Sequence, residues 1–435
     1  MSVPYVFEAY ELKAYGLKAY ELNTCGLKRN ILAISRSILA LVLMFAAAIS
    51  HASAAINANE SALSHNAAAL SHNVAALSQK ESATRQISSL KAHFNKQFLV
   101  GSAINAQQAK KTNKDTHAII IAQFNTITPE NEMKWERIHP KPDKYEFSLS
   151  DEYVNYGLTN NMFTIGHTLV WHSQTPDWVF EDAQGKPISR LALLARMKDH
   201  IHTIVSRYKG KIKGWDVVNE ALNEDGSLRD SKWLQIIGDD FIEKAFTYAH
   251  EADPNAELYY NDYNLYKPDK SAGAARLIKS LQDKGIPVHG VGLQGHYSLT
   301  HPDLSELEDA LTLFSTLGIQ SMITELDVSV LPFPSEAEQG ADISQDLDLQ
   351  KALNPFPNGL PQKQQDALSA RYRAIFSLFL KQQNHLSRVT FWGVNDANSW
   401  RNNWPMRDRT DYPLLFDRTN RAKAAYDAVI ALPVD

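Results

Sequence analysis

Short runs rich in apolar and β-branched residues alternate with amphipathic stretches along most of the chain, from residue 98 to residue 396. The stretches between the runs are long enough for helices, and strands that alternate with helices are typical of parallel βαβ units. Eight such units in roughly 340 residues fit a (β/α)8 TIM barrel, so we predict an α/β fold with a single barrel domain. The predicted strands are 98–105, 126–128, 163–171, 214–219, 257–262, 288–296, 320–328 and 388–396.

A doubly wound parallel sheet is the alternative that the same alternation allows. That fold binds phosphate groups through a glycine-rich turn, yet no G-x-G-x-x-G opens a predicted helix in this chain. The barrel is therefore the preferred fold. Predicted helices include 191–207, 233–252, 274–284, 304–317 and 364–383.

The amino-terminal stretch predicts a targeting segment that precedes the fold. Residues 1–36 carry five Lys or Arg against three Glu, the apolar run ILALVLMFAAAI follows at 38–49, and Ala52-Ser53-Ala54 comes next. This order is typical of a secretory signal peptide, and the run is shorter than the about 20 residues that a membrane-spanning helix needs. An uncleaved membrane anchor is the alternative. We expect residues 1–54 to be a leader that is cleaved near Ala54, and the mature protein to be secreted or periplasmic without a membrane span.

Residues 55–87 predict a linker. ALSHNAA, ALSHNVA and ALSQ follow one another from residue 62, which places Leu63, Leu70 and Leu77 seven apart, as in a coiled coil. Two and a half heptads are too few for that structure, and an Ala-, Ser- and Asn-rich composition suits a partly helical linker. The remaining residues, 88–435, are assigned to the barrel domain.

Composition and spacing argue against several classes of partner and cofactor. The formal net charge is -5, whereas a nucleic-acid partner would require a basic face. The single cysteine, Cys25, excludes a disulfide scaffold and a cysteine-rich zinc site. His167 and His172 stand five apart and no H-E-x-x-H occurs, so we expect no catalytic metal.

Polar residues cluster at the carboxyl ends of the predicted strands. In barrels of this kind the active site is built at that face. A polar rim without catalysis is the alternative, but buried polar atoms must be satisfied, and polar groups at seven of eight strand ends are hard to explain by packing. The residues concerned are Asn131, His167, Asn219, Glu220, Asn261, Asp262, Gln294, His296, Glu325, Asn395 and Asp396.

Two glutamates are the candidates for catalysis. Glu220 follows the fourth predicted strand and Glu325 lies in the seventh, so their side chains would face each other across the barrel. Carboxylates about 5–5.5 Å apart suit retaining hydrolysis of a glycosidic bond, and a gap of about 6.5–9.5 Å suits inverting hydrolysis. Asp327 points to the same face of its strand as Glu325. His296, from the neighbouring strand end, could hydrogen-bond Glu325 and keep it ionised.

Tryptophans near the same strand ends indicate a carbohydrate substrate, because sugar rings present apolar faces that stack on aromatic rings. Core packing is the alternative for each of them, and Trp215, which precedes the exposed end of its strand, is assigned to the core. Planar polar groups would bind the sugar hydroxyls. The aromatic candidates are Trp171, Trp392 and Trp400, with Trp135 and Trp178 nearby, and the polar candidates are Asn131, Lys134, His167, Gln294 and His296.

Seven motifs give the chain a specific resemblance. TPENEMKWE at 128–136 is similar to the second-strand signature of glycoside hydrolase family 10, the endo-β-1,4-xylanases. Six further segments resemble that family in the same order, and together the seven cover about 98–429. These segments are GHTLVWHSQTPDW (166–178), WDVVNEAL (215–222), YYNDYN (259–264), VGLQGHY (291–297), ITELDV (323–328) and WGVNDANSW (392–400).

The resemblance implies a retaining double displacement on xylan or xylo-oligosaccharides, carried out by a single catalytic domain without a cofactor. Glu325 would be the nucleophile and Glu220 the acid/base. We also expect a monomer. The implied sugar contacts are Glu130, Asn131 and Lys134 two sugars before the scissile bond, His167, Asn219, Gln294 and His296 around the sugar that is cleaved, Trp171, Trp392 and Trp400 as its aromatic platform and lid, and Tyr263 on the leaving-group side, with Asp327 in support.

Two other functions stay open at this point. A β-1,4-glucan or aryl-cellobioside hydrolase would use the same machinery and differ in its tolerance of a hydroxymethyl group near Glu130 and Lys134. A non-catalytic xylan-binding protein would have lost a glutamate, yet both are present. The long loop at 331–366 departs from the family pattern and would stand beside the nucleophile, where it could reshape the leaving-group side.

Overall fold

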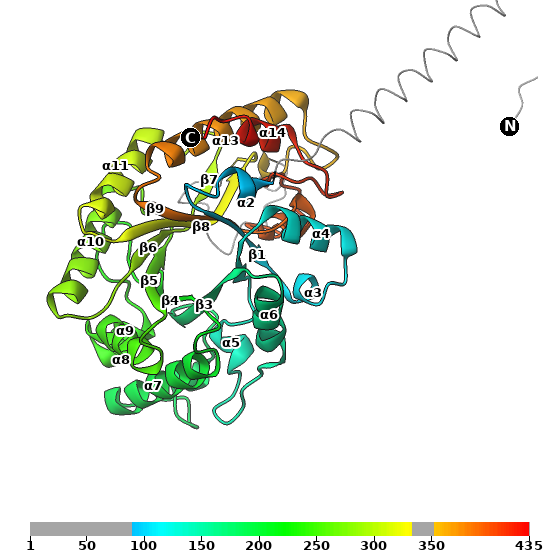
Figure 1. The fold of residues 1–435 in the computed structure, drawn as a ribbon. Helices are drawn as coiled ribbons and strands as arrows, with labels where there is room; N and C mark the ends of the chain where they lie inside the picture. The colour runs from blue at the N-terminus through cyan, green and yellow to red at the C-terminus, as the bar shows by residue number, and fades with distance from the viewer. Residues whose placement is uncertain (1–88, 333–351, 435) are drawn as a thin grey trace, which may run out of the picture. The chain divides into compact units, whose positions relative to one another are not determined.

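The computed structural model describes residues 89–332 and 352–434, and these form the barrel (Figure 1). The predicted leader at 1–54 and linker at 55–87 lie outside the described residues, as does the middle of the 331–366 loop. Export and the two amino-terminal boundaries therefore stay predictions from the sequence. Within the described ranges, no helix combines the length and the apolar character that crossing a membrane requires.

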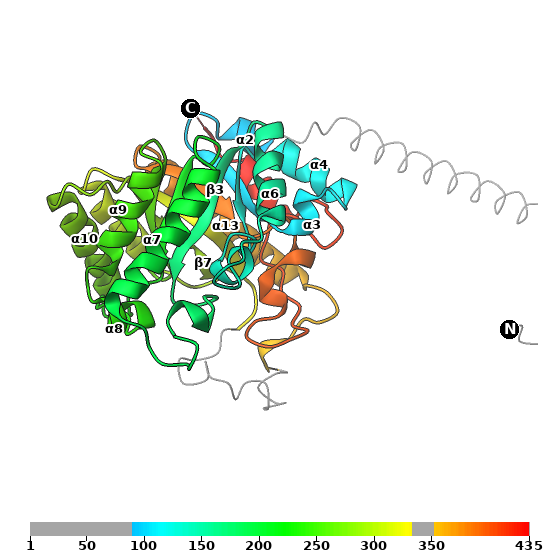
Figure 2. The same ribbon diagram turned by 90° about the horizontal axis from the view of Figure 1, so that it is seen from below.

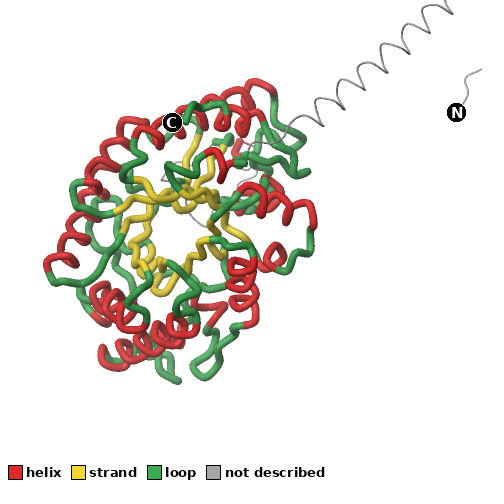
Figure 3. Tube along the Cα trace, in the orientation of Figure 1, coloured by secondary structure: helices red, strands yellow, loops and turns green. Residues whose placement is uncertain are grey.

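Eight parallel strands close into a ring, as predicted. Each of the first five strands pairs with the next one along the chain, β9 pairs with β1 and β8, and the pairing of β6 with β8 closes the barrel. Figure 3 shows the closed ring of strands with the helices outside it. The strands are β1 (Leu99–Ile104), β2 (Thr126–Pro129), β3 (Phe163–Trp171), β4 (Gly214–Asn219), β5 (Glu257–Asp262), β6 (Gly290–Leu293), β8 (Gln320–Ser329) and β9 (Leu386–Phe391).

Two predicted strands extend three or more residues beyond the observed ones. The segment 288–296 divides into β6 and a short extra strand, β7 (His296–Ser298), because Gly295 has a positive φ of 86° that turns the chain. β7 pairs with β8 and sets His296 opposite Asp327. The segment 388–396 also ends early, since β9 stops at Phe391 and Asp396 begins a short 3₁₀ turn.

Helices surround the ring, and Figure 2 shows α7 lying along the strands in a side-on view. Local sequence sets several of their starts: the Ser189 hydroxyl accepts from the Ala192 amide at the start of α7. The predicted helix 233–252 is interrupted, because Gly238 has a φ of 104°. The helices are α2 (Leu90–His93), α3 (Ala106–Ala109), α4 (Lys114–Gln123), α5 (Trp135–Ile138), α6 (Ser148–Thr159), α7 (Arg190–Arg207), α8 (Lys232–Ile237), α9 (Phe241–Ala252), α10 (Pro268–Asp283), α11 (Leu304–Ser315), α13 (Gln362–Lys381) and α14 (Ala424–Ile430).

The core contains the one tryptophan that the sequence assigned to packing. Trp215 on β4 is 1% exposed and lies across Gly166 of the neighbouring strand β3. A Cβ atom on Gly166 would come within 2.1 Å of the Trp215 ring, so only glycine allows this contact. Because His167 follows directly, the same close packing also sets the position of a candidate site residue.

We predict that Gly166→Ala lowers the free energy of unfolding by about 2 kcal/mol, because the added methyl group overpacks the contact with Trp215. Chemical denaturation of the wild type, Gly166→Ala, Trp215→Leu and the double variant would measure this as a double-mutant cycle. The double variant should lose less stability than the two single losses combined, since a smaller side chain at 215 makes room. Strict additivity would contradict the proposed clash.

Candidate active site

Glu325 lies in β8 and is 5% exposed. Its Oε1 accepts a hydrogen bond from Asn261 Nδ2 at 2.8 Å, and its Oε2 lies 3.3 Å from His296 Nε2. Burial alone would raise the pKa of Glu325, but the His296 hydrogen bond and the charges of His167, His296 and Lys134 bring it below its ordinary value. The carboxylate is therefore held ionised, as a nucleophile requires.

His296 joins two buried carboxylates. Its Nε2 faces Glu325, and its Nδ1 lies 3.1 Å from Asp327 Oδ1. Burial would lower the pKa of His296, but the Asp327 and Glu325 carboxylates raise it to about 9. The ring is thus charged at neutral pH, and the predicted contact between His296 and Glu325 is present.

Asp327 is fully buried and pairs with the His296 nitrogen that faces away from Glu325. Its Oδ1 accepts from Arg401 Nε and its Oδ2 from Trp400 Nε1, both at 2.7 Å. Burial would raise the pKa of Asp327, whereas the charges of Arg401 and His296 lower it. The carboxylate therefore stays ionised, and it orients both the histidine and the Trp400 ring.

Glu220 follows β4 directly and is partly exposed. Its Oε2 accepts from Trp171 Nε1 at 2.9 Å, and its Oε1 accepts from Gln294 Nε2 at 2.9 Å. Its φ of 56° lies in the left-handed region, which costs a residue with a side chain about 1–2 kcal/mol. Such strain persists where the surroundings fix the backbone, and here the Glu220 amide donates to the Asn261 carbonyl at 2.8 Å.

A chain of amide side chains connects the two glutamates. Gln294, which binds Glu220, lies 3.4 Å from Asn219, and Asn219 lies 2.9 Å from Asn261, which binds Glu325. The Asn261 oxygen accepts from the Thr324 hydroxyl at 2.6 Å, so its amide nitrogen must face Glu325. Asn261 was not among the predicted sugar contacts, although its place in YYNDYN at a strand end was the available signal. The two carboxylates therefore lie at the ends of one rigid polar chain.

Lys134, Asn131 and Glu130 come together after β2. Lys134 Nζ donates to Asn131 Oδ1 at 3.1 Å and lies 5.1 Å from the Trp171 ring centre. Burial and the nearby Glu132 raise the pKa of Glu130 to about 7. Glu132 itself accepts from the backbone amides of Ala106 and Asn131, so it holds the loop in shape, a role that the sequence did not reveal.

His167 lies in β3 and is almost fully buried. Its Nδ1 lies 2.9 Å from Asp216 Oδ2 on β4, and its ring meets the Trp392 ring edge-on at 5.4 Å. The pairing follows from sheet register, because His167 and Asp216 are direct partners. Asp216 was not predicted as a site residue. It fixes the His167 ring so that the other ring nitrogen is available to a ligand.

The tryptophans separate into two groups. Trp171 donates to Glu220, and Trp400 packs 5.0 Å from His296, which pairs with Glu325. Trp392 lies beside Lys134 and His167. Trp135, by contrast, is 2% exposed and stacks on His200 at 3.5 Å. For Trp135 the structure therefore shows the core packing that was the alternative, because the short helix α5 turns its side chain inward.

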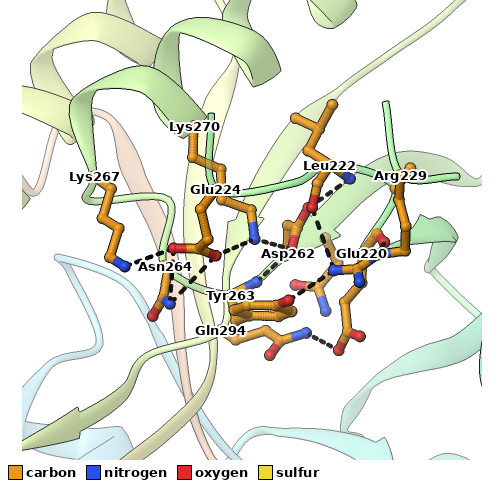
Figure 4. Close-up of polar contacts among 12 residues, drawn as sticks. Glu220, Leu222, Glu224, Arg229, Asp262, Tyr263, Asn264, Lys267, Lys270 and Gln294 are labelled. Carbon is orange, nitrogen blue, oxygen red and sulfur yellow. Dashed lines mark hydrogen bonds and ion pairs between the residues drawn. The ribbon is translucent and has the colours of Figure 1, made fainter. Parts of the chain in front are cut away.

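Tyr263 follows β5 directly, and Figure 4 shows it beside Arg229. Its hydroxyl accepts from Arg229 Nη2 at 2.7 Å, and Lys270 Nζ lies 3.5 Å from its ring centre. Lys270 is fully buried and forms ion pairs with Asp262 at 3.0 Å and Glu224 at 3.2 Å. The sequence did not predict these cations near the site, because Arg229 lies in the loop after β4 and Lys270 in α10, outside the strand-end motifs.

No three His, Cys, Asp or Glu side chains of the described residues come together as ligands for a metal ion. The polar groups instead face two carboxylates in contrasting surroundings, one buried against a charged histidine and one held by an indole and an amide. Two such carboxylates among tryptophans and amides, at the carboxyl end of a parallel barrel, define a glycoside hydrolase.

Comparison with known proteins gives the family. The model of glycosyl hydrolase family 10 matches residues 89–432, so the chain belongs to this family. Endo-1,4-beta-xylanase A of Xylanibacter ruminicola is 43% identical over 344 residues, which cover 79% of this chain and 93% of the relative. Endo-1,4-beta-xylanase of Geobacillus stearothermophilus is 42% identical over 346 residues, which cover 79% of this chain and 98% of the relative.

Solved structures agree with this assignment. A GH10 endoxylanase retrieved from a sugarcane soil metagenome superposes with a TM-score of 0.73 at 41% identity, covering 79% of this chain and 98% of that one. A mutant structure in complex with xylotriose has a TM-score of 0.71 at 36% identity, covering 79% and 100%. The barrel and the family that the motifs suggested are thereby confirmed.

We predict that the ion pairs of His296 make stability depend on pH. A pKa of about 9 in the folded state against 6.5 in the unfolded state stabilises the fold by about 3 kcal/mol at low pH. Because the folded pKa is the higher one, this contribution is complete below pH 6.5 and disappears as the pH rises through 9. Urea unfolding of the wild type and His296→Gln across this range would measure it.

The stability of the His296→Gln variant should not fall in this way as the pH rises through 9. His202→Gln is the matched control, since His202 forms a surface pair with Glu251 at 3.2 Å, and it should retain the wild-type pH dependence. An unchanged pH dependence in His296→Gln would contradict the charged state of the ring.

Proposed function

We propose that the protein hydrolyses internal β-1,4-xylosidic bonds of xylan with retention of configuration, with Glu325 as nucleophile and Glu220 as acid/base. The observation that carries this proposal is the contrast between the two carboxylates. Glu325 is buried and ionised beside a charged His296, whereas Glu220 is partly exposed and bound by Trp171 and Gln294. Membership of family 10 and the xylanase relatives support the substrate class.

In the first step a Glu325 oxygen forms a bond to the anomeric carbon while the glycosidic C–O bond breaks. The departing electron pair remains on the leaving oxygen, which takes the proton of Glu220. Asn261 binds one Glu325 oxygen and His296 faces the other, so the nucleophile attacks from a fixed orientation. The product of this step is a covalent glycosyl-enzyme.

In the second step Glu220, now ionised, takes a proton from a water molecule, and the water oxygen forms a bond to the anomeric carbon. The bond to Glu325 breaks, and the carboxylate regains its contacts with His296 and Asn261. Two inversions at one carbon give net retention. Gln294 Nε2 donates to the Glu220 carboxylate and would hold this group in place while it acts first as an acid and then as a base.

The xylan chain would be bound on both sides of the scissile bond. Glu130, Asn131 and Lys134 would bind hydroxyls two sugars before it, and His167 those of the sugar that is cleaved. Trp171, Trp392 and Trp400 supply aromatic faces. Trp171 also donates to Glu220, so it links sugar stacking with the orientation of the acid. Tyr263 stands on the leaving-group side.

We predict that Glu325→Ala abolishes hydrolysis of xylan, with a fall of about 10⁴-fold or more in kcat, while xylo-oligosaccharide binding persists. Reducing-sugar release and calorimetry would measure the two quantities. Glu251→Ala is the control, because Glu251 pairs with Lys198 on the protein surface, and it should keep wild-type activity. Proton NMR of the wild-type reaction should show the β-anomer first. Initial release of the α-anomer would overturn the retaining mechanism.

We predict a strong preference for xylan over β-1,4-glucan in parallel rate measurements. Glucose units carry a hydroxymethyl group that xylose lacks, and this group would meet the cluster of half-buried Glu130 and buried Lys134. A close-packed polar cluster rejects a group for which it has no partner or space. Equal rates on the two polymers would refute the strict xylanase assignment and favour a glucan-cleaving enzyme with the same catalytic residues.

A further inference from the structure

Arg229 reaches back from the loop after β4 to the start of that loop. Its Nε donates to the backbone carbonyl of Glu220 at 3.0 Å, and its Nη2 donates to the Leu222 carbonyl at 3.3 Å. Its own amide donates to the Ala221 carbonyl at 2.8 Å. One side chain and one amide therefore bind three successive carbonyls, beginning with that of the acid/base candidate.

The orientation of the Glu220 carbonyl affects the direction of the Glu220 side chain. With a φ of 56°, Glu220 has a backbone conformation that residues with side chains seldom adopt. Its amide is fixed by the Asn261 carbonyl at 2.8 Å, and its carbonyl is fixed by Arg229 at 3.0 Å. If the carbonyl were released, the peptide plane after Glu220 could rotate, and the side chain on the same Cα would change direction.

Arg229 is also bound by Tyr263, in addition to the three backbone carbonyls. Its Nη2 donates to the Tyr263 hydroxyl at 2.7 Å, and the face of the Tyr263 ring lies 3.5 Å from Lys270 Nζ. Lys270 is buried and paired with Asp262 Oδ1 at 3.0 Å. Figure 4 shows this row of groups from α10 to Glu220. None of these contacts reaches the Glu220 carboxylate, which is bound by Trp171 and Gln294.

We propose that Arg229, fixed through Tyr263, is a positioning residue that directs the carboxyl group of Glu220 toward the leaving oxygen. This inference rests on the proposed role of Glu220 as acid/base. Arg229 acts on the backbone of Glu220, so it determines the geometry of proton transfer without itself exchanging a proton. A displacement of about 1 Å at such a group can cost about 100-fold in rate.

The test compares aryl β-xylobiosides whose leaving groups differ in basicity. A phenolate leaving group needs a proton from Glu220, whereas a dinitrophenolate leaves without one. The value of kcat/KM reports the first bond-breaking step for both. We expect Arg229→Met to lower kcat/KM by about 30-fold for the phenyl substrate and by less than about 3-fold for the dinitrophenyl substrate. Arg229→Lys, which restores one donor, should lie between Arg229→Met and the wild type.

Arg276→Met is the matched control. Arg276 also donates to a backbone carbonyl of this loop, that of Gly226 at 3.4 Å, but it does not contact Glu220. Its removal should leave the ratio of the two kcat/KM values unchanged. Equal losses on both substrates in Arg229→Met would show that Arg229 only supports the fold and would overturn the inference. If Arg229→Met does not fold, Arg229→Lys provides the test. A larger loss of kcat/KM on the phenyl substrate than on the dinitrophenyl substrate would support the inference, and equal losses would overturn it.

Glu220→Gln separates failure of the inference from failure of the proposed function. It should lower kcat/KM for the phenyl substrate by about 10²–10⁴-fold and leave the dinitrophenyl substrate nearly unaffected. If Glu220→Gln lowers both values equally, the acid/base assignment itself is wrong. If Glu220→Gln discriminates between the substrates and Arg229→Met does not, only the role of Arg229 is refuted.

Discussion

The buried charge row of Glu325, His296, Asp327 and Arg401 is the interaction on which the active site depends. Burying a single carboxylate in an apolar interior would raise its pKa and neutralise it. Here two carboxylates stay ionised because one protonated histidine lies between them and a buried arginine donates to Asp327 at 2.7 Å. Removal of any member would leave an uncompensated buried charge. The ionised state of Glu325 is therefore a property of the whole row and not of that carboxylate alone.

The second carboxylate is controlled by different means. Glu220 has neutral partners at its carboxylate, an indole and an amide at 2.9 Å each, and its backbone is fixed in a left-handed conformation. An acid/base must gain and lose a proton in each cycle, so a permanent ion pair would hinder it. One barrel thus supports two glutamates with opposite requirements, because one is fixed by charge and the other by hydrogen bonds and backbone geometry.

Much of the fold could be predicted because the alternation of apolar runs and amphipathic stretches is a local signal. The strands at 163–171, 214–219 and 257–262 were predicted to the residue. The errors lie where backbone geometry overrides the pattern. Gly295 and Gly238 interrupt segments whose apolar periodicity continues across them. Periodicity alone does not reveal such turns.

The sequence by itself determined the barrel and the family and singled out the two glutamates as candidates, because strand periodicity and strand-end motifs are encoded in neighbouring residues. Only the tertiary structure decided which groups control them. Arg401 reaches Asp327, and Arg229 reaches Tyr263, across separations of 74 and 34 residues. Asp216 meets His167 only through strand register. Hydrogen bonds and ion pairs act over a few ångströms in space, whatever the separation in sequence, so these partners become apparent only after the chain has closed into a ring.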